Sequence, residues 1–148
     1  MRALRSLRSA CSFAALSLAL GACGGNDDTQ AAIADGRAIV TANDCAGCHQ
    51  ESGSTQVLAG RDTPITGTQV YPSNLTPDQA TGLGSWTDAQ IIAAVRTGVD
   101  DEGATLCPNM PRFSTLTDTQ VNHLVAYLRS IPAVSHTVPE SHCPPTRP

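Results

Sequence analysis

The chain has 148 residues, enough for a single domain, and nine basic residues against thirteen acidic ones give it a formal net charge of −4. All nine basic residues are arginines. Nucleic-acid binding needs a basic face that displaces counterions from phosphates, so this balance excludes nucleic acid as the expected partner. An acidic chain is instead steered toward partners with positive patches.

The N-terminus has the pattern of an export signal. Three arginines within the first eight residues precede an apolar stretch of 11 residues, 10–20. A membrane-spanning helix needs about 20 apolar residues, so this stretch predicts a signal-peptide core. The following letters, LGAC, resemble the lipobox of bacterial lipoproteins, which implies cleavage after residue 22 and lipid attachment to Cys23. The alternative is an ordinary signal peptide cut near Ala22, with Cys23 left as a free thiol.

Cleavage would divide the chain into four parts. Residues 1–22 are the signal peptide, and residues 23–30, which include GGNDDTQ, are expected to form a lipid-anchored flexible linker. Residues 31–132 form the domain, and residues 133–148 form a Pro-rich tail. Loss of three of the nine arginines leaves six against thirteen acids, a formal net charge near −7. We expect the periplasmic face of a bacterial membrane, with the outer membrane favoured because Gly24, not Asp, follows Cys23.

The motif CAGCH at residues 45–49 is the attachment signature of c-type haem. The thiols of Cys45 and Cys48 can reach the two vinyl groups on one edge of a porphyrin, and His49 is then placed to bind the iron. A redox dithiol and half of a zinc site are the alternatives. A redox dithiol calls for a surrounding βαβ pattern, and a zinc site calls for a second pair of closely spaced ligands. The sequence displays neither pattern.

Met110 is the expected second axial ligand. It is the only methionine after the signal peptide, and Pro108 and Pro111 restrict the backbone on both sides of it. A rigid loop lets a weak iron–sulfur bond form without a large ordering cost. The alternative ligands are the three histidines outside the motif, His123, His136 and His142.

Two cysteines remain, Cys107 and Cys143. Leftover thiols in an exported protein usually pair, so we expect a disulfide that pins the tail to the loop of Met110. Closing a loop of about 36 residues stabilises a fold by roughly 4 kcal/mol in the chain-entropy model. Two independent free thiols are the alternative.

Three helices are predicted. The first covers residues 31–44, with Gly36 on its apolar stripe, which indicates a close helix crossing. Capping boxes at Thr87 and Thr117 mark the starts of two more helices, the last of them spanning residues 118–130. Residues 51–86 lack any period, and we expect this long loop to wrap a cofactor that supplies the apolar surface missing from the chain.

The order of these features resembles class I cytochrome c, over roughly residues 31–132. The matching pieces are DCAGCHQ, NLTPD, TGLGSWTDAQI, AVRTGVD and MPRFSTLTDTQVNHLVAYLRSIP. The middle pieces are similar to cytochrome c domains associated with membrane-bound bacterial dehydrogenases. The resemblance implies an all-α cytochrome c fold, with three to five helices and long loops wrapped round one covalently bound haem c. It also implies that the first and last helices cross near Gly36 and Tyr127.

The same resemblance implies the roles of the site residues. Cys45 and Cys48 hold the haem, while His49 and Met110 bind its iron. Asn74 and Trp86 fall in the segment that lies near the haem propionates in similar proteins. A further hypothesis is that Arg61 offsets the propionate charge.

These features predict a monomeric electron-transfer protein. Two bound axial ligands leave the iron no open position, so we expect a one-electron carrier and no enzyme. Dihaem peroxidases need two haem motifs and this chain has one, which makes peroxidase activity an unfavoured alternative. Expected partners are a dehydrogenase or a terminal oxidase, reached from the lipid anchor. The alternative function is a haem-based ligand sensor or binding module in which Met110 is displaced.

Overall fold

The computed structural model describes residues 24–143. The expected signal peptide and lipid-bearing Cys23 lie outside the described residues. Between residues 24 and 143 the chain forms four α-helices, one short 3-10 helix and no β-strand, which confirms the predicted all-α class. In chain order the elements are α1 (Gly24–Ala42), α2 (Cys45–His49), the 3-10 helix η1 (Leu83–Ser85), α3 (Asp88–Arg96) and α4 (Asp118–Ser130).

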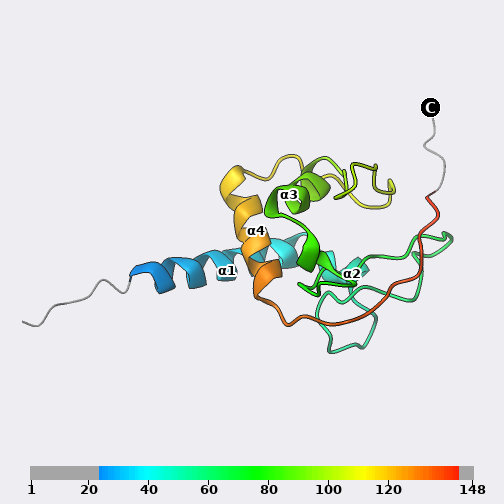
Figure 1. Ribbon diagram of the computed structural model, residues 1–148, viewed down its shortest axis with the longest axis horizontal. Helices are drawn as coiled ribbons and strands as arrows, with labels where there is room; N and C mark the ends of the chain where they lie inside the picture. The colour runs from blue at the N-terminus through cyan, green and yellow to red at the C-terminus, as the bar shows by residue number, and fades with distance from the viewer. Residues whose placement is uncertain (1–23, 144–148) are drawn as a thin grey trace, which may run out of the picture.

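The first and last helices cross in direct contact, as the resemblance implied (Figure 1). Gly36 of α1 lies against the α4 backbone. A Cβ atom at this position would overlap the carbonyl oxygen of His123 and lie only 2.8 Å from Cβ of Tyr127. Glycine disfavours a helix by about 1 kcal/mol relative to alanine, and the close approach of two helix backbones is the physical reason for it here.

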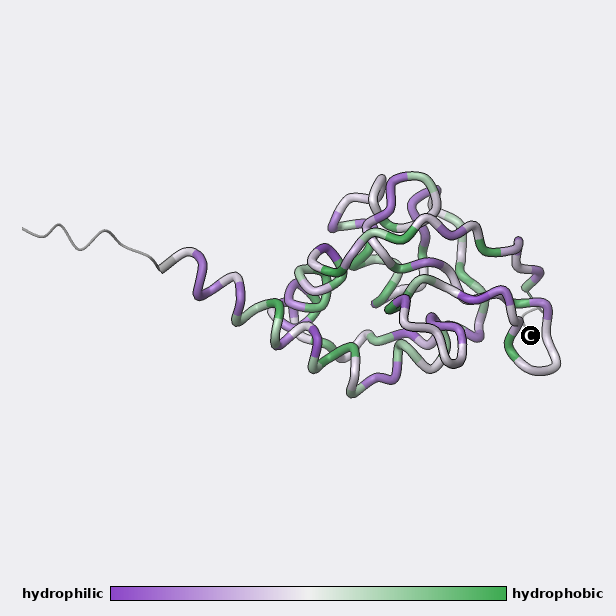
Figure 2. Tube along the Cα trace, turned by 90° about the horizontal axis from the view of Figure 1, so that it is seen from below, coloured by the Kyte–Doolittle hydropathy of each residue, from purple (hydrophilic) through white to green (hydrophobic). Residues whose placement is uncertain are grey.

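Helix α1 begins earlier than the sequence predicts. The expected flexible linker, residues 24–30, forms the first turns of α1, and residues 25–30 are exposed. Figure 2 shows these turns projecting from the body of the domain. The glycines and aspartates of these turns are poor helix formers. The turns continue a helix that is stabilised further along by the packing of α1 on α4. Within residues 24–143 no helix is both long enough and apolar enough to cross a membrane.

The capping boxes predicted for the other two long helices are confirmed. At the start of α3 the Thr87 hydroxyl accepts a hydrogen bond from the Gln90 amide, and Gln90 Oε1 accepts one from the Thr87 amide at 2.8 Å. Thr117 and Gln120 form the same pair of bonds at the start of α4. Gly98, with φ of 71°, follows α3 in the left-handed conformation that glycine adopts without strain.

The core lies where α1, α3, α4 and η1 meet. Helix α4 supplies four buried side chains at the spacing of one helix face. The buried apolar cluster consists of Val40, Leu58, Leu83, Ile91, Val95, Val121, Leu124, Val125, Leu128 and Ile131.

The tail beyond α4 runs back along the long loop between α2 and η1 (Figure 1). The Val134 amide donates to the Thr76 hydroxyl at 3.1 Å, and the His142 amide donates to the Gln69 carbonyl at 2.9 Å. These bonds give the described part of the Pro-rich tail a defined course without regular secondary structure.

The crossing generates the first testable prediction. Gly36→Ala should destabilise the domain by about 2–3 kcal/mol, because the new methyl group meets the backbone of α4 and cannot be accommodated by a side-chain rotation. Gly25→Ala is the matched control in the same helix, since nothing lies within 4 Å of its Cβ position. It should be neutral or stabilising by up to about 1 kcal/mol. Urea unfolding of both variants measures the difference, and equal free energies of unfolding would contradict the packing role.

Candidate functional site

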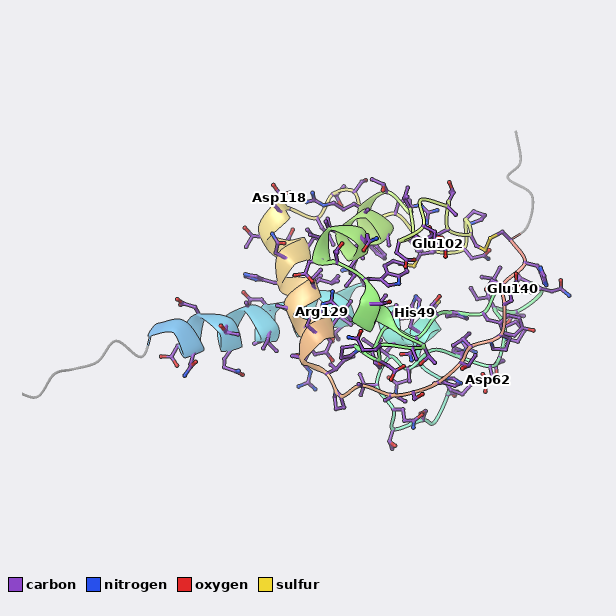
Figure 3. The ribbon with its side chains drawn as sticks, viewed as in Figure 1. His49, Asp62, Glu102, Asp118, Arg129 and Glu140 are labelled. Atoms are coloured by element: carbon purple, nitrogen blue, oxygen red, sulfur yellow. A yellow bond between two sulfur atoms is a disulfide. The ribbon has the colours of Figure 1, made fainter. Side chains whose placement is uncertain are left out.

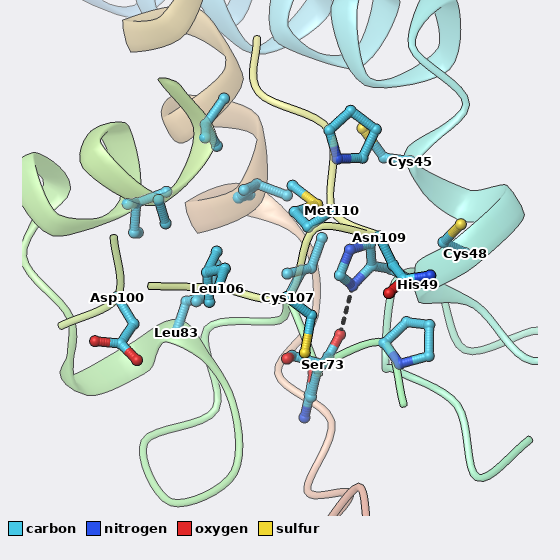
Figure 4. A pocket seen from close by; sticks show the side chains of 18 of the residues that line it. Cys45, Cys48, His49, Ser73, Leu83, Asp100, Leu106, Cys107, Asn109 and Met110 are labelled. Carbon is cyan, nitrogen blue, oxygen red and sulfur yellow. Dashed lines mark hydrogen bonds between the residues drawn. The ribbon is translucent and has the colours of Figure 1, made fainter. Parts of the chain in front are cut away.

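A cavity of about 430 Å³ lies inside the domain and is walled by residues from all five helical elements and the loops between them. Most of its lining is apolar, with Leu83, Ile91, Leu124 and Leu128 among the side chains. Its volume is in the range of about 300–1,000 Å³ typical of ligand and cofactor sites. The CAGCH motif and Met110 lie in its wall (Figure 4).

The motif forms α2, which follows α1 after a sharp change of direction. Asp44 at the junction has a left-handed backbone with φ of 50°. Its carboxylate lies over Gly47, where a Cβ atom would collide with it, so the glycine of the motif has a local structural cause. Cys45 is half-buried and Cys48 exposed, and both are free thiols that line the cavity. Burial raises the pKa of the Cys45 thiol.

His49 is oriented by the backbone of the long loop. Its Nδ1 lies 2.8 Å from the carbonyl oxygen of Ser73. A carbonyl can only accept, so Nδ1 carries the proton and Nε2 keeps its lone pair. Burial lowers the pKa of His49, against the opposing effect of this hydrogen bond, and a neutral ring is the form that binds metals. The imidazole is therefore prepared to bind a metal through Nε2.

Asn74, next to Ser73, is a buried junction between this loop and the tail. Its side chain is 2 % exposed, and Nδ2 donates to Val134 O at 2.8 Å and to Thr81 Oγ1 at 3.1 Å. Its Oδ1 accepts from the amide and the hydroxyl of Thr76. Both ends of the carboxamide are thus engaged within the protein, although Asn74 does line the cavity. Its structural role is to fix the segment that holds His49.

Met110 lies on the loop between α3 and α4, far from the motif in chain order but in the same cavity wall (Figure 4). Its amide donates to the Cys107 carbonyl at 3.0 Å, which closes a tight turn. Cys107 is joined to Cys143 by a disulfide, the pairing expected from the sequence. Asn109, also in the cavity wall, has a buried Oδ1 with no hydrogen-bond partner among the described residues.

The other residues selected from the sequence are placed as follows. Trp86 lines the cavity. Arg61 does not: it donates to the Gly47 carbonyl at 3.3 Å and lies 4.0 Å from Glu51. The placement therefore gives no support to a contact between Arg61 and a haem propionate, and that contact stays a prediction.

Two of the three alternative axial ligands are engaged elsewhere, and the third, His142, is exposed and does not line the cavity. Nδ1 of His123 lies 3.2 Å from Oδ2 of Asp35, and Nε2 of His136 lies 3.0 Å from Oδ1 of Asp62. No group of three or more candidate metal ligands occurs within residues 24–143. The zinc alternative thus finds no second ligand pair beside the motif.

The donor set fits a covalently attached haem. Two free thiols three residues apart, a neutral histidine with one free ring nitrogen and a thioether all face one apolar cavity. Together with the all-α fold, this defines a c-type haem protein. A family model described as cytochrome c matches residues 33–132, and the chain belongs to the cytochrome c family. Membership implies covalently bound haem c.

Similar proteins include cytochrome subunits of dehydrogenases. The chain is 39% identical over 108 residues to a nicotinate dehydrogenase subunit of Pseudomonas putida, covering 70% of this chain and 9% of that protein. It is 37% identical over 101 residues to the fructose dehydrogenase cytochrome subunit of Gluconobacter japonicus, covering 65% of this chain and 20% of that subunit. It is 34% identical over 114 residues to the gluconate 2-dehydrogenase cytochrome c subunit of Pantoea cypripedii, covering 74% of this chain and 25% of that subunit. The aligned stretch thus spans a quarter or less of each of these relatives.

Sequence reasoning misses the parts of the site made by backbone carbonyls and long-range hydrogen bonds. The Ser73 carbonyl leaves no signal in the sequence because every residue carries one. The sequence does select Asn74, but for a different role from the one its hydrogen bonds define.

The disulfide generates a prediction about the Met110 loop. Cys107→Ser should leave the haem attached and lower the free energy of unfolding by about 2–4 kcal/mol, because the tail is no longer tied to the loop of Met110. Cys143→Ser is the matched control, because it breaks the same bond from the other end. Both variants and the double variant should unfold at the same urea concentration. A double variant less stable than either single variant would show that the two thiols act separately.

His136 predicts a pH dependence of stability. Its Nδ1 bonds the Ala59 carbonyl at 2.7 Å and its Nε2 bonds Asp62 at 3.0 Å, both of which are acceptors. The bond to the Ala59 carbonyl, and then Asp62, raise the pKa of His136. Because the pKa of His136 is higher in the folded state, its protonation stabilises the fold. This stabilisation is fully present below the unfolded-state pKa of about 6.5 and is lost as the pH rises through the folded-state pKa.

The measurement compares wild type with His136→Gln in urea at two pH values. The stability difference should shrink as the pH rises from about 5.5 to about 8.5, because the raised pKa favours the charged imidazole in the folded state. His142→Gln, which removes an exposed histidine side chain from the same tail, is the matched control. A difference for His136 that is constant across this range would contradict the proton-linked contribution.

Proposed function

We propose that the protein is a monohaem c-type cytochrome that carries one electron at a time between redox partners, with His49 and Met110 as the axial ligands. The observation that carries the proposal is the meeting of the single C-x-x-C-H motif and the only methionine after the signal peptide in one apolar cavity. The orientation of His49 by Ser73 supports its role, since Nε2 is the nitrogen left for the iron.

This ligand set favours an electron carrier over an enzyme that transforms a substrate. The bound haem supplies reversible one-electron oxidation and reduction of its iron, and His/Met ligation raises the reduction potential. The protein excludes water with the apolar side chains of α3 and α4, holds the His49 ring through Ser73 and restrains the Met110 loop through Cys107. If His49 and Met110 both bound the iron, they would leave peroxide no site at which to bind.

The proposed partners are a dehydrogenase or a terminal oxidase. A dehydrogenase is supported by the names of the relatives, whose subunits belong to nicotinate, fructose and gluconate dehydrogenases. The chain has thirteen acidic residues against nine basic ones, which favours a partner with a basic docking face; Figure 3 labels three of the acidic side chains, Asp62, Glu102 and Glu140. Attachment at Cys23 would hold the monomeric protein at the periplasmic face of a bacterial membrane, with the outer membrane favoured.

A spectroscopic comparison of wild type and Met110→Ala tests the proposal. The alkaline pyridine haemochrome of wild type should have the c-type signature, with one haem per chain. The ferric protein should show the charge-transfer band of an iron–methionine bond at the red end of the visible spectrum. Met110→Ala should lose this band, lower its reduction potential and bind carbon monoxide rapidly when reduced.

The result also separates the carrier from its alternative. A carrier of this kind binds carbon monoxide slowly or not at all in the wild-type reduced state at neutral pH. Rapid binding by wild type would favour a ligand sensor with a displaceable Met110. A pyridine haemochrome without the c-type signature, or more than one haem per chain, would refute the monohaem proposal itself.

A further inference from the structure

The side chain of Arg112 bridges the loop that carries Met110. Its Nη2 donates to the Leu106 carbonyl at 2.8 Å, and its Nη1 donates to the carbonyl of Met110 itself. The two carbonyls stand at the two ends of the segment that contains Cys107, Pro108 and Asn109. One planar guanidinium thus closes this segment into a loop of fixed width, which a single-point donor cannot do.

Gly98 provides the space for this arrangement. A Cβ atom on Gly98 would overlap the guanidinium of Arg112, so the cation packs directly on the glycine backbone. The Gly98 carbonyl also accepts the Leu106 amide at 2.9 Å, which ties the start of the same loop to the end of α3. The φ of 71° at Gly98 adds a second reason for glycine at this position. Gly98 and Arg112 therefore act as one structural unit.

The charge of Arg112 sets it apart from the other half-buried arginines. Arg61, Arg96 and Arg129 each have a carboxylate within 4.0 Å, whereas Arg112 forms no ion pair within residues 24–143. Its positive charge is met only by carbonyl dipoles, beside a residue of the cavity wall. A cation held in a partly buried position is weakly screened and acts on nearby charges.

We propose that Arg112 is the positioning residue for Met110, and that its uncompensated charge raises the reduction potential of the haem. This inference rests on the proposed function, because it assumes that Met110 binds the iron. The bridge restricts the Met110 backbone, which would lower the ordering cost of a bond from Met110 to the iron. The charge disfavours the oxidised iron, which carries one more positive charge than the reduced iron.

Four variants separate the two effects. Arg112→Gln removes both the bridge and the charge. Arg112→Lys keeps the charge but cannot span both carbonyls, and Gly98→Ala keeps the arginine but displaces its guanidinium. Arg96→Gln is the matched control: Arg96 also spans two acceptors, the Asp118 carboxylate and the Leu116 carbonyl, but forms no hydrogen bond to residues 106–110.

The measurements are imidazole titration of the ferric holoprotein and the midpoint potential. Losing charged hydrogen bonds to the loop should raise the apparent imidazole affinity about tenfold or more in the first three variants, because Met110 is displaced more easily. The potential should fall most in Arg112→Gln and less in Arg112→Lys and Gly98→Ala. Arg96→Gln should keep its imidazole affinity within about twofold of wild type even where urea unfolding shows a loss of stability.

Each outcome decides the proposal. Wild-type imidazole affinity and potential in Arg112→Gln would overturn the positioning role while leaving the proposed ligands intact. An equal change in Arg96→Gln would also overturn it, by assigning the effect to general destabilisation. If wild type lacks the iron–methionine band, the ligand assignment fails first, and the role of Arg112 fails with it. Arg112→Lys and Gly98→Ala keep the test decisive if Arg112→Gln does not fold.

Discussion

The direct contact between the backbones of α1 and α4 at Gly36 is the constraint on which the rest of the structure depends. Helix α1 leads almost directly into the CAGCH motif, and α4 begins shortly after the loop of Met110. The crossing therefore fixes the relative positions of two segments that lie far apart in the chain. Because a helix crossing with no intervening side chain leaves little freedom to slide, the crossing restricts the relative movement of the two segments that line the cavity.

A second layer of restraint comes from polar groups. The tail beyond α4 bonds to the loop that orients His49 through Asn74 and Thr76, and its disulfide reaches the turn before Met110. One segment thus contacts the supports of both sides of the cavity. These contacts stand in for regular secondary structure, since the long loop and the described part of the tail are held by isolated bridges, by backbone hydrogen bonds within turns and by hydrogen bonds from side chains.

The local parts of this architecture can be predicted from the sequence. Helix starts at Thr87 and Thr117 are recognisable because capping boxes act between residues three apart. Gly36 is recognisable because a glycine within an apolar helix stripe costs stability unless two backbones approach closely there. The first turns of α1 are not predictable, because residues 24–30 have low helix propensity and lack the packing that stabilises the rest of α1.

The parts that cannot be predicted are long-range and directional. Asn74 meets Val134 across 60 residues of sequence, and the Arg112 bridge depends on where two carbonyls point. Hydrophobic period and spacing do not encode such bonds. For the site, the motif is enough to select the residues proposed to hold the haem, whereas the groups that orient those residues become visible only in three dimensions.

The disulfide has a consequence for how the protein is made. Under the proposed function, the four cysteines of residues 24–143 have two different chemical fates: Cys45 and Cys48 would remain thiols until they form thioethers, while Cys107 and Cys143 are oxidised to a disulfide. The first pair lies in one short helix and the second joins positions 36 residues apart. A Cys45–Cys48 disulfide would leave no thiol to form a thioether, so the proposed haem attachment requires these two cysteines to stay reduced while Cys107 and Cys143 are oxidised.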